Sequence, residues 1–386
     1  MAGEPYNPAH GVGSAIPQNA PAMLREVYEQ PAALRDTIKH NVKDTRILPT
    51  ALYSVENALS GVRRIIIAAS GSSRNAGLAG EIMMEDLADL AVDVEYSSEY
   101  VLRSTHAGPD SIILLVTQSG ETADTIAAQR EALERGAKTI AISNVADSTI
   151  SREASAALIT YAAPERAVPA TKSFTAQLAV LYLFALFMAR ERKRITTEAA
   201  QQHLHELAAL PGKIESHLAT WDSHASEAAN VVRDARAFLF LGRGIHYAIA
   251  REGALKLKEI SYIQAEGMPA GELRHGPNAL VDEKLVVITL ATRDTSDHDS
   301  TLRFQKTLGV LEYVKSCRGR VIAIAAESDR EVTKVAERVI FVPPAPELLL
   351  PILEVIPLQL FAYHFATING CDVDHPRHLV KAVIRE

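Results

Sequence analysis

The stretch RIIIAASGSSRNAG, residues 64–77, decides the fold class. Its first six residues form an unbroken run of β-branched and small apolar side chains, which is typical of a strand buried on both faces of a sheet. A loop rich in serine and glycine follows, and a helical pattern then continues to Leu87. A buried strand, a polar turn and a helix in that order predict one unit of a parallel α/β sheet.

The same unit recurs along the chain. Gly71 and Gly242 occupy corresponding positions in the two halves, and in each half a glutamate, Glu81 or Glu252, follows ten residues later. Strands are predicted at residues 64–69, 111–116, 139–143, 237–241, 284–290 and 320–325. We therefore expect an α/β protein with two homologous tandem domains, each a doubly wound parallel sheet flanked by helices.

This repeat divides the chain into four parts. Residues 1–44 are expected to form a leader and an N-terminal helix, with a flexible, Gly- and Pro-rich beginning. The two α/β domains are expected at 45–195 and 215–370, with a helical linker near residues 195–217. Residues 371–386 are expected to form a C-terminal tail.

Composition excludes several classes of protein. A chain of 386 residues with 47% hydrophobic and 23% charged residues is typical of a soluble globular protein of two or three domains. Its net charge of −7 favours neither nucleic acid nor an anionic membrane as a partner. Two isolated cysteines, Cys317 and Cys371, fit a reducing compartment and no structural zinc.

Targeting signals are not evident in the sequence. The longest apolar run, residues 178–189, is too short to span a bilayer and predicts a buried core helix. The N-terminal residues lack the basic and apolar regions of a signal peptide, so we expect a cytoplasmic protein. No metal or cofactor is expected.

A second stretch, residues 251–277 (REGALKLKEISYIQAEGMPAGELRHGP), carries candidate catalytic residues. Glu252, Lys256 and Glu259 fall at i, i+4 and i+7, so their side chains share one helix face. With His275 in the loop that follows, this set suits enolisation of a sugar carbonyl. The alternative is an ordinary salt-bridged surface helix, and the spacing alone leaves both interpretations open.

Hydroxyl side chains gather in two strand-to-helix loops of the first half. They are Ser70, Ser72, Ser73, Thr117, Ser119 and Thr122. Loops of this kind lie at the carboxyl edge of a parallel sheet, where the helix N-termini favour an anion. We predict a phosphate monoester site here; the alternative is that the hydroxyls are only helix caps. Neither loop is a P-loop, and Gly242-Arg243-Gly244 lacks the third glycine of a dinucleotide site.

Several longer motifs resemble the sugar isomerase (SIS) domains of glucosamine-6-phosphate synthases. The resemblance runs from about residue 25 to the end of the sequence. It is carried by REVYEQP (25–31), TQSGETADT (117–125), ATKSFTAQ (170–177), FLGRG (240–244), EGALKLKEISYI (252–263), GELRHGP (271–277) and the final HPRHLVKAVIRE.

The resemblance implies a role for each matching residue. Glu259 matches the base that moves a proton between C1 and C2, and Lys256 matches the neighbouring catalytic lysine. His275 matches the ring-opening residue, which in the family comes from the partner subunit, so a homodimer is expected. Lys381 matches the lysine that forms a Schiff base with the open ketose. The implied substrate-binding residues are Ser72, Ser73, Thr117, Gln118, Ser119, Thr122, Val168 and Val380.

The sequence also departs from the family pattern. Ala2 stands where a synthase has its glutaminase cysteine, and Gln264 and Ala170 replace the usual His and Ser. We therefore expect no glutaminase activity, and interconversion of fructose 6-phosphate and glucosamine 6-phosphate that releases or uses free ammonia. A deglycase of a sugar–amino acid 6-phosphate and a non-catalytic sugar-phosphate-binding regulator are the alternatives.

Overall fold

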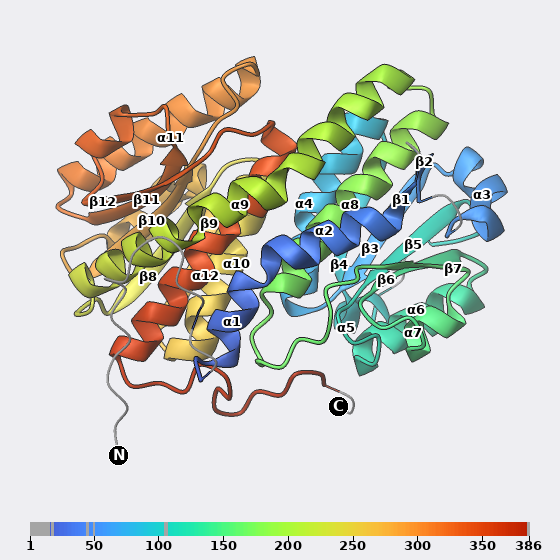
Figure 1. Cartoon of the computed structure of the whole chain (residues 1–386), viewed down its shortest axis with the longest axis horizontal. Helices are drawn as coiled ribbons and strands as arrows, with labels where there is room; N and C mark the ends of the chain where they lie inside the picture. The colour runs from blue at the N-terminus through green and yellow to red at the C-terminus, as the bar shows by residue number, and fades with distance from the viewer. Residues whose placement is uncertain (1–15, 17–18, 44–45, 49–50, 104–106, 384–386) are drawn as a thin grey trace.

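Two five-stranded sheets form the framework of the molecule (Figure 1). The computed structural model describes residues 16, 19–43, 46–48, 51–103 and 107–383. The first sheet has the order β4-β3-β5-β6-β7 and the second β12-β11-β10-β8-β9, and the strands within each sheet are parallel. Since β3 corresponds to β8 and β5 to β10, the two sheets share one topology. The predicted α/β fold with two tandem domains is confirmed.

The predicted strands are all present within about two residues of their expected ends. The strands of the first sheet are β3 (Arg64–Ala69), β4 (Ala91–Tyr96), β5 (Ser111–Val116), β6 (Lys138–Ser143) and β7 (Ala156–Ile159). Those of the second sheet are β8 (Ala237–Gly242), β9 (Gln264–Pro269), β10 (Leu285–Ala291), β11 (Arg320–Ala326) and β12 (Arg338–Val342). The sequence did not predict β4, β7, β9 or β12. A short hairpin, β1 (Val42–Lys43) and β2 (Arg46–Ile47), precedes the first sheet.

Helices cover both sheets and fill the space between them (Figure 1). In the first half they are α1 (Ala22–Tyr28), α2 (Gln30–Asn41), α3 (Glu56–Gly61), α4 (Gly71–Ala88), α5 (Ser97–Tyr100), α6 (Ala123–Glu134), α7 (Thr149–Glu153) and α8 (Lys172–Glu191). Next come α9 (Thr197–Val231), α10 (His246–Ser261), α11 (His298–Ser316) and α12 (Leu350–Ile368). The linker predicted near residues 195–217 is the first part of α9, which is 35 residues long.

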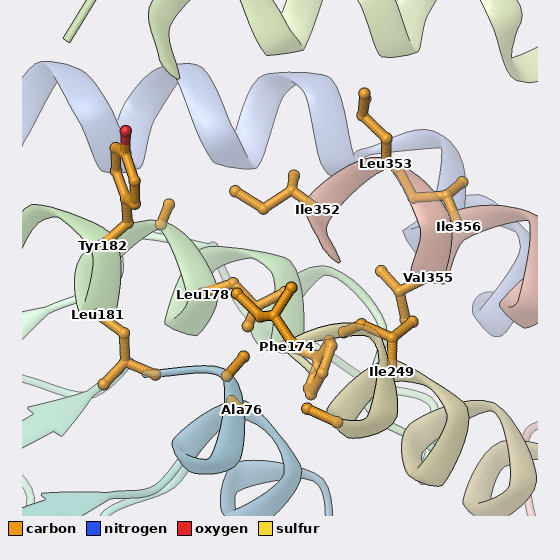
Figure 2. Packing of buried hydrophobic residues seen from close by; sticks show 14 of the residues in the cluster. Ala76, Phe174, Leu178, Leu181, Tyr182, Ile249, Ile352, Leu353, Val355 and Ile356 are labelled. Carbon is orange, nitrogen blue, oxygen red and sulfur yellow. The ribbon is translucent and has the colours of Figure 1, made fainter. Parts of the chain in front are cut away.

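A continuous apolar core joins the two domains. Figure 2 shows Phe174 and Leu178 of α8 packed beside Ala76 of α4, with Ile249 of α10 and Val355 of α12 facing them. All five are fully or almost fully buried. Helices α4 and α10 therefore meet at a fixed contact, and each begins at the carboxyl edge of its own sheet.

Two helices, Lys172–Glu191 and Glu347–Ile368, are long and apolar enough to cross a membrane by length and composition. In each, 94% of the apolar window is buried inside the protein. Burial of this extent is what a central core helix requires, and α8 and α12 occupy that position. The run at 178–189, predicted to be a buried helix, lies within α8.

The C-terminal tail is docked rather than loose over the part that the structure describes. The Asp374 carboxylate accepts hydrogen bonds from the backbone N–H groups of Ala22 and Met23, at 2.7 and 2.8 Å, and so caps α1. Farther along, the Val383 carbonyl accepts from Ala123 N–H at 3.0 Å. These contacts lay the tail across the first domain. Most of the predicted leader, residues 1–15 and 17–18, lies outside the described residues.

Candidate functional site

A pocket of about 280 Å³ lies at the carboxyl edge of the first sheet. Four parts of the chain form it: the loops after β3 and β5, the segment just before α8, the helix α10 of the second domain, and the tail. Its lining includes Ser72, Ser73, Thr117, Gln118, Ser119, Thr122, Val168, Lys256, Glu259, Val380 and Lys381. Every substrate-binding residue named from the sequence therefore lines one cavity, together with three of the four catalytic candidates.

The hydroxyl wall is built at the start of two helices. The N-cap residues of α4 and α6 are Ser70 and Thr122, and neither uses its side chain to cap its helix. The interpretation of these two hydroxyls as helix caps is therefore wrong, and they remain available to a ligand. Gly120 has φ of 69°, and a Cβ there would lie 2.0 Å from Ser148 Oγ, so the second loop requires glycine.

The charged wall comes from α10. Lys256 Nζ lies 2.6 Å from Glu259 Oε2 and 3.5 Å from Glu252 Oε1. Glu252 is fully buried and also accepts hydrogen bonds from Ser72 Oγ at 2.8 Å and Asn75 Nδ2 at 2.9 Å. The side chain of Lys256 is only 1% exposed, while that of Glu259 is 21% exposed. These residues are therefore not a solvated surface ladder, and the interpretation as an ordinary salt-bridged helix is wrong.

Electrostatics keep Lys256 charged. Burial would lower the pKa of its ammonium group, but Glu259 and Glu252 outweigh burial and raise the pKa above its ordinary value. Burial raises the pKa of Glu252, although Lys256 and Asn75 oppose this shift. Lys256 and Glu259 both line the pocket, and Glu259 is the more exposed of the two. The arrangement presents a carboxylate base with a fixed cation behind it.

Lys381 is held by a residue that the sequence analysis missed. Its Nζ donates hydrogen bonds to Glu165 Oε2 at 2.5 Å and to the Ala167 carbonyl at 2.7 Å. Glu165 also accepts hydrogen bonds from Thr171 and Ser173 at the start of α8, through both backbone N–H and hydroxyl groups. Burial would raise the pKa of Glu165, but Lys381, together with Ser173 and Thr171, lowers it.

The signal for Glu165 was weak. It follows Pro164 in a segment that is neither helix nor strand, five residues before the ATKSFTAQ motif. Only the contact between the tail and this segment, 216 residues apart in sequence, brings Glu165 to Lys381. Spacing along the chain carries no information about that contact.

His275 is not brought to the pocket by its own chain. It ends the short 3-10 helix η2 (Ala270–His275), is exposed, and does not line the cavity. Its expected role in a partner's site stays a prediction.

The corresponding edge of the second sheet is filled by side chains. His246, at the start of α10, lies 2.8 Å from Glu354 and 3.1 Å from Glu347. Glu347 also accepts hydrogen bonds from Ser300 and Arg303. Burial would lower the pKa of His246, but Glu354 and Glu347 raise it to about 10. Burial would raise the pKa of Glu347, but His246, Ser300 and Arg303 lower it to about 2.

Comparison with known proteins agrees with this geometry. The family model described as SIS domain matches residues 58–187 and 232–369, one match for each sheet. The chain belongs to the SIS family. The chain thus contains two SIS domains, and the candidate pocket lies at the sheet edge of the first.

The chain is similar in sequence to aminotransferases over almost its whole length. The chain is 45% identical over 366 residues to the isomerizing glutamine–fructose-6-phosphate aminotransferase of Chlorobaculum tepidum, covering 94% of this chain and 58% of that protein. It thus spans somewhat more than half the length of that relative, and the proportion is the same for the enzyme of Methanosarcina acetivorans, at 41% identity.

Solved SIS structures show the same architecture. The C-terminal domain of glucosamine-fructose-6-phosphate aminotransferase from Francisella tularensis superimposes with a TM-score of 0.86 at 33% identity, covering 94% of this chain and all of that one. The glucosamine-6-phosphate deaminase of Thermotoga maritima superimposes with a TM-score of 0.70 at 20% identity, over 94% of this chain and 99% of that one, and so shares the fold.

Proposed function

We propose that this chain interconverts fructose 6-phosphate and glucosamine 6-phosphate, with ammonia as the nitrogen donor or product. One observation carries the proposal: a hydroxyl-lined wall, Glu259 and Lys381 line the same cavity of about 280 Å³. The likeness to the aminotransferase C-terminal domain supports the choice of sugars. The hydroxyls and the two helix N-termini suit the phosphate group of such a sugar.

Glu259 is the proposed base for proton transfer between C1 and C2. After nitrogen is installed at C2, Glu259 removes a proton from C1 and returns it to C2. The proton of the C1 hydroxyl passes to the nitrogen, so the C2 imine becomes the aldehyde with an amino group at C2. Lys256, charged and 2.6 Å from Glu259, stabilises the negative charge that appears as the proton moves. General base catalysis of this kind contributes about a hundredfold to ten-thousandfold in rate.

Lys381 is the proposed nucleophile. Lys381 first passes a proton to Glu165, which contacts its Nζ, and the neutral amine then attacks C2 of the open-chain ketose. A water molecule leaves, and a C2=N bond to the lysine forms. Ammonia then adds at C2, and the lysine amine departs and recovers its proton. Glu165 and the Ala167 carbonyl hold Nζ beside the cavity before the sugar binds. The reverse sequence releases ammonia from glucosamine 6-phosphate.

The test is turnover with a panel of sugars. The purified chain is assayed with fructose 6-phosphate with and without ammonia, and with glucosamine 6-phosphate. We expect conversion that Lys381→Ala abolishes together with borohydride trapping of the ketose. Absence of turnover while sugar phosphate still binds would instead support a regulator, and turnover only on a sugar–amino acid 6-phosphate would support a deglycase.

A shared site in a homodimer completes the proposal. His275 is exposed on its own chain, so the ring-opening step is assigned to His275 of a second copy. Glu259→Ala and His275→Ala proteins are each expected to be inactive and to regain activity when mixed and allowed to exchange subunits. No recovery despite demonstrated exchange would contradict the shared site.

A further inference from the structure

A second pocket, of about 290 Å³, lies between the two domains on the other side of the β3–α4 loop. Gly71 borders both this pocket and the candidate active site. Arg74 of α4 and Arg251 of α10 both line the second pocket and are half-buried. We call it the arginine pocket.

Arg74 has only neutral contacts. Its guanidinium carbon stacks 3.8 Å from the centroid of the Tyr96 ring, and one terminal nitrogen lies 3.4 Å from the Val94 carbonyl. Its Nε is buried and has no hydrogen-bond partner. Burial, and then the charge of Arg251, lower the pKa of Arg74, which Tyr96 only partly offsets.

Arg251 reaches the same tyrosine from the other domain. Its terminal nitrogens donate to the hydroxyls of Tyr96 and Tyr247, each at 3.0 Å, and its Nε lies 3.4 Å from Asn75 Oδ1. Among the residues that the structure describes, no carboxylate oxygen lies within the 4.0 Å ion-pair distance of Arg74 or Arg251. Two positive charges therefore share one tyrosine without a contacting counter-ion.

The acidic neighbours do not neutralise this pair. Glu266 lines the arginine pocket and is exposed to solvent. Glu81 lies two turns after Arg74 on α4, and burial, with Glu85 and Asp93, raises its pKa to about 7. At neutral pH Glu81 is therefore only partly ionised. Lys258 adds a third cation to the pocket wall.

We propose that the arginine pocket binds the phosphate group of a small molecule or free phosphate. Its lining carries three cations and one carboxylate, an excess of two positive charges. A phosphate monoester carries about −1.5 to −2 at pH 7, which matches that excess better than a single carboxylate does. Guanidinium groups also present the forked donors that phosphate oxygens accept.

An occupant of this pocket has a short route to the candidate active site. Asn75 contacts Arg251 through Oδ1 and donates to Glu252 through Nδ2, and Glu252 contacts Lys256. A phosphate that moves Arg251 therefore also moves Asn75, which holds Glu252 in the charged wall. The phosphate site itself does not depend on the reaction proposed above.

The proposal is tested by calorimetric titration with inorganic phosphate. The wild-type chain is expected to show two classes of site, one in each pocket. Arg74→Gln and Arg251→Gln should each weaken one class by about tenfold or more, the cost of losing a charged hydrogen bond. Ser119→Ala should weaken the other class. Arg330→Gln, which removes a guanidinium stacked 4.9 Å from the Phe341 ring, is the matched control and should change neither.

Each contrary result overturns the proposal. Titrations of folded Arg74→Gln and Arg251→Gln proteins that match the wild type would do so, as would loss of all phosphate binding in Ser119→Ala. A single class of site in the wild type, with Arg74→Gln altering self-association in sedimentation, would assign the arginines to a carboxylate of a second copy. Comparing glucosamine 6-phosphate with inorganic phosphate on Ser119→Ala protein separates the sources, since a sugar phosphate site binds the former more tightly.

Discussion

The two sheets share one topology, but their carboxyl edges differ: the first borders an open cavity, and the second is occupied by a buried cluster of charged side chains. In the first domain the loops after β3 and β5 leave a cavity lined by hydroxyls. In the second domain the corresponding edge is closed by His246, with Glu347 and Glu354 on either side of it. At the second edge the anion is the carboxylate of Glu347, which belongs to the protein. At the first edge the corresponding space is open to an anion from a ligand. The fold supplies two equivalent edges, and side chains decide which of them can bind a ligand.

The charged side chains at the open edge come from outside the first domain. Lys256 and Glu259 come from α10, which starts at the closed edge, and Lys381 comes from the tail. The buried ion pairs of His246 with Glu347 and Glu354 therefore fix the start of α10, the helix that places Lys256 and Glu259 in the wall of the open pocket.

Glu259→Gln should have the largest effect on activity. Loss of the base is expected to slow exchange of solvent deuterium at C1 and C2 by about a hundredfold to ten-thousandfold, with sugar-phosphate binding nearly unchanged. Glu312→Gln, an exposed change on α11 of the same domain, is the control and should exchange at the wild-type rate. Full-rate exchange in Glu259→Gln would rule out the assignment of the base.

His246→Gln should open the closed edge at a cost in stability. Removing one partner of a buried ion cluster typically costs about 3–5 kcal/mol. Because the folded-state pKa of His246 is raised from 6.5 to about 10, its stabilisation is fully present below pH 6.5 and is lost as the pH rises through about 10. Denaturant unfolding should therefore separate wild type and variant most at pH 6 and least above pH 10.

A matched histidine checks this interpretation. His217 lies 3.2 Å from Glu327, but the two side chains are 25% and 47% exposed. An exposed pair contributes about 0–1 kcal/mol, so His217→Gln should change stability little at either pH. An equal loss in both variants would contradict the argument from burial.

Glu165→Gln should release Lys381. Loss of one hydrogen bond between charged groups costs about 1.5–3 kcal/mol, so borohydride trapping of the ketose should fall by about tenfold or more. Deuterium exchange supported by Glu259 should fall less, because Glu165 does not contact that residue. A thermal melt checks that the buried site still folds. Trapping at the wild-type level would show that Lys381 needs no carboxylate to hold it.

Ser119→Ala should have the smallest effect, on binding alone. One lost hydrogen bond to a charged phosphate is expected to weaken sugar-phosphate affinity by about tenfold. Ser296→Ala, in the corresponding loop of the second domain, removes only an exposed contact to Asp294 and should leave affinity unchanged. Calorimetry on the two variants compares the edges directly, and unchanged affinity in Ser119→Ala would place the phosphate elsewhere.

The sequence predicted the central strands but none of the edge strands. The six predicted strands are continuous apolar runs because both faces of each are buried. The four that were missed, β4, β7, β9 and β12, are the edges of the two sheets. An edge strand such as β9, QAEGMP, is partly exposed and carries charge, so its composition does not separate it from a loop.

The same limit applies to the candidate site. Spacing grouped Glu252, Lys256 and Glu259 because one helix determines their geometry. The resemblance to the family predicted Lys381. The role of Glu165 in holding it depends on the packing of the tail against the segment before α8, which only the structure shows. The closing of the second edge by Glu347 and His246 likewise depends on contacts across 101 residues of chain. Local patterns carry no record of such contacts.

The cap on α1 ties together the two ends of the described chain. Asp374 holds the backbone of Ala22 and Met23, and Lys381 lies seven residues beyond Asp374 on the same tail. A displacement at the start of α1 can therefore be passed to Lys381 in the pocket wall through the tail, without moving either sheet. Shortening the protein from its N-terminus past Met23 would remove one of the contacts that hold the tail at the opposite terminus. The position of Lys381, the proposed nucleophile, therefore depends in part on residues more than 350 positions earlier in the chain.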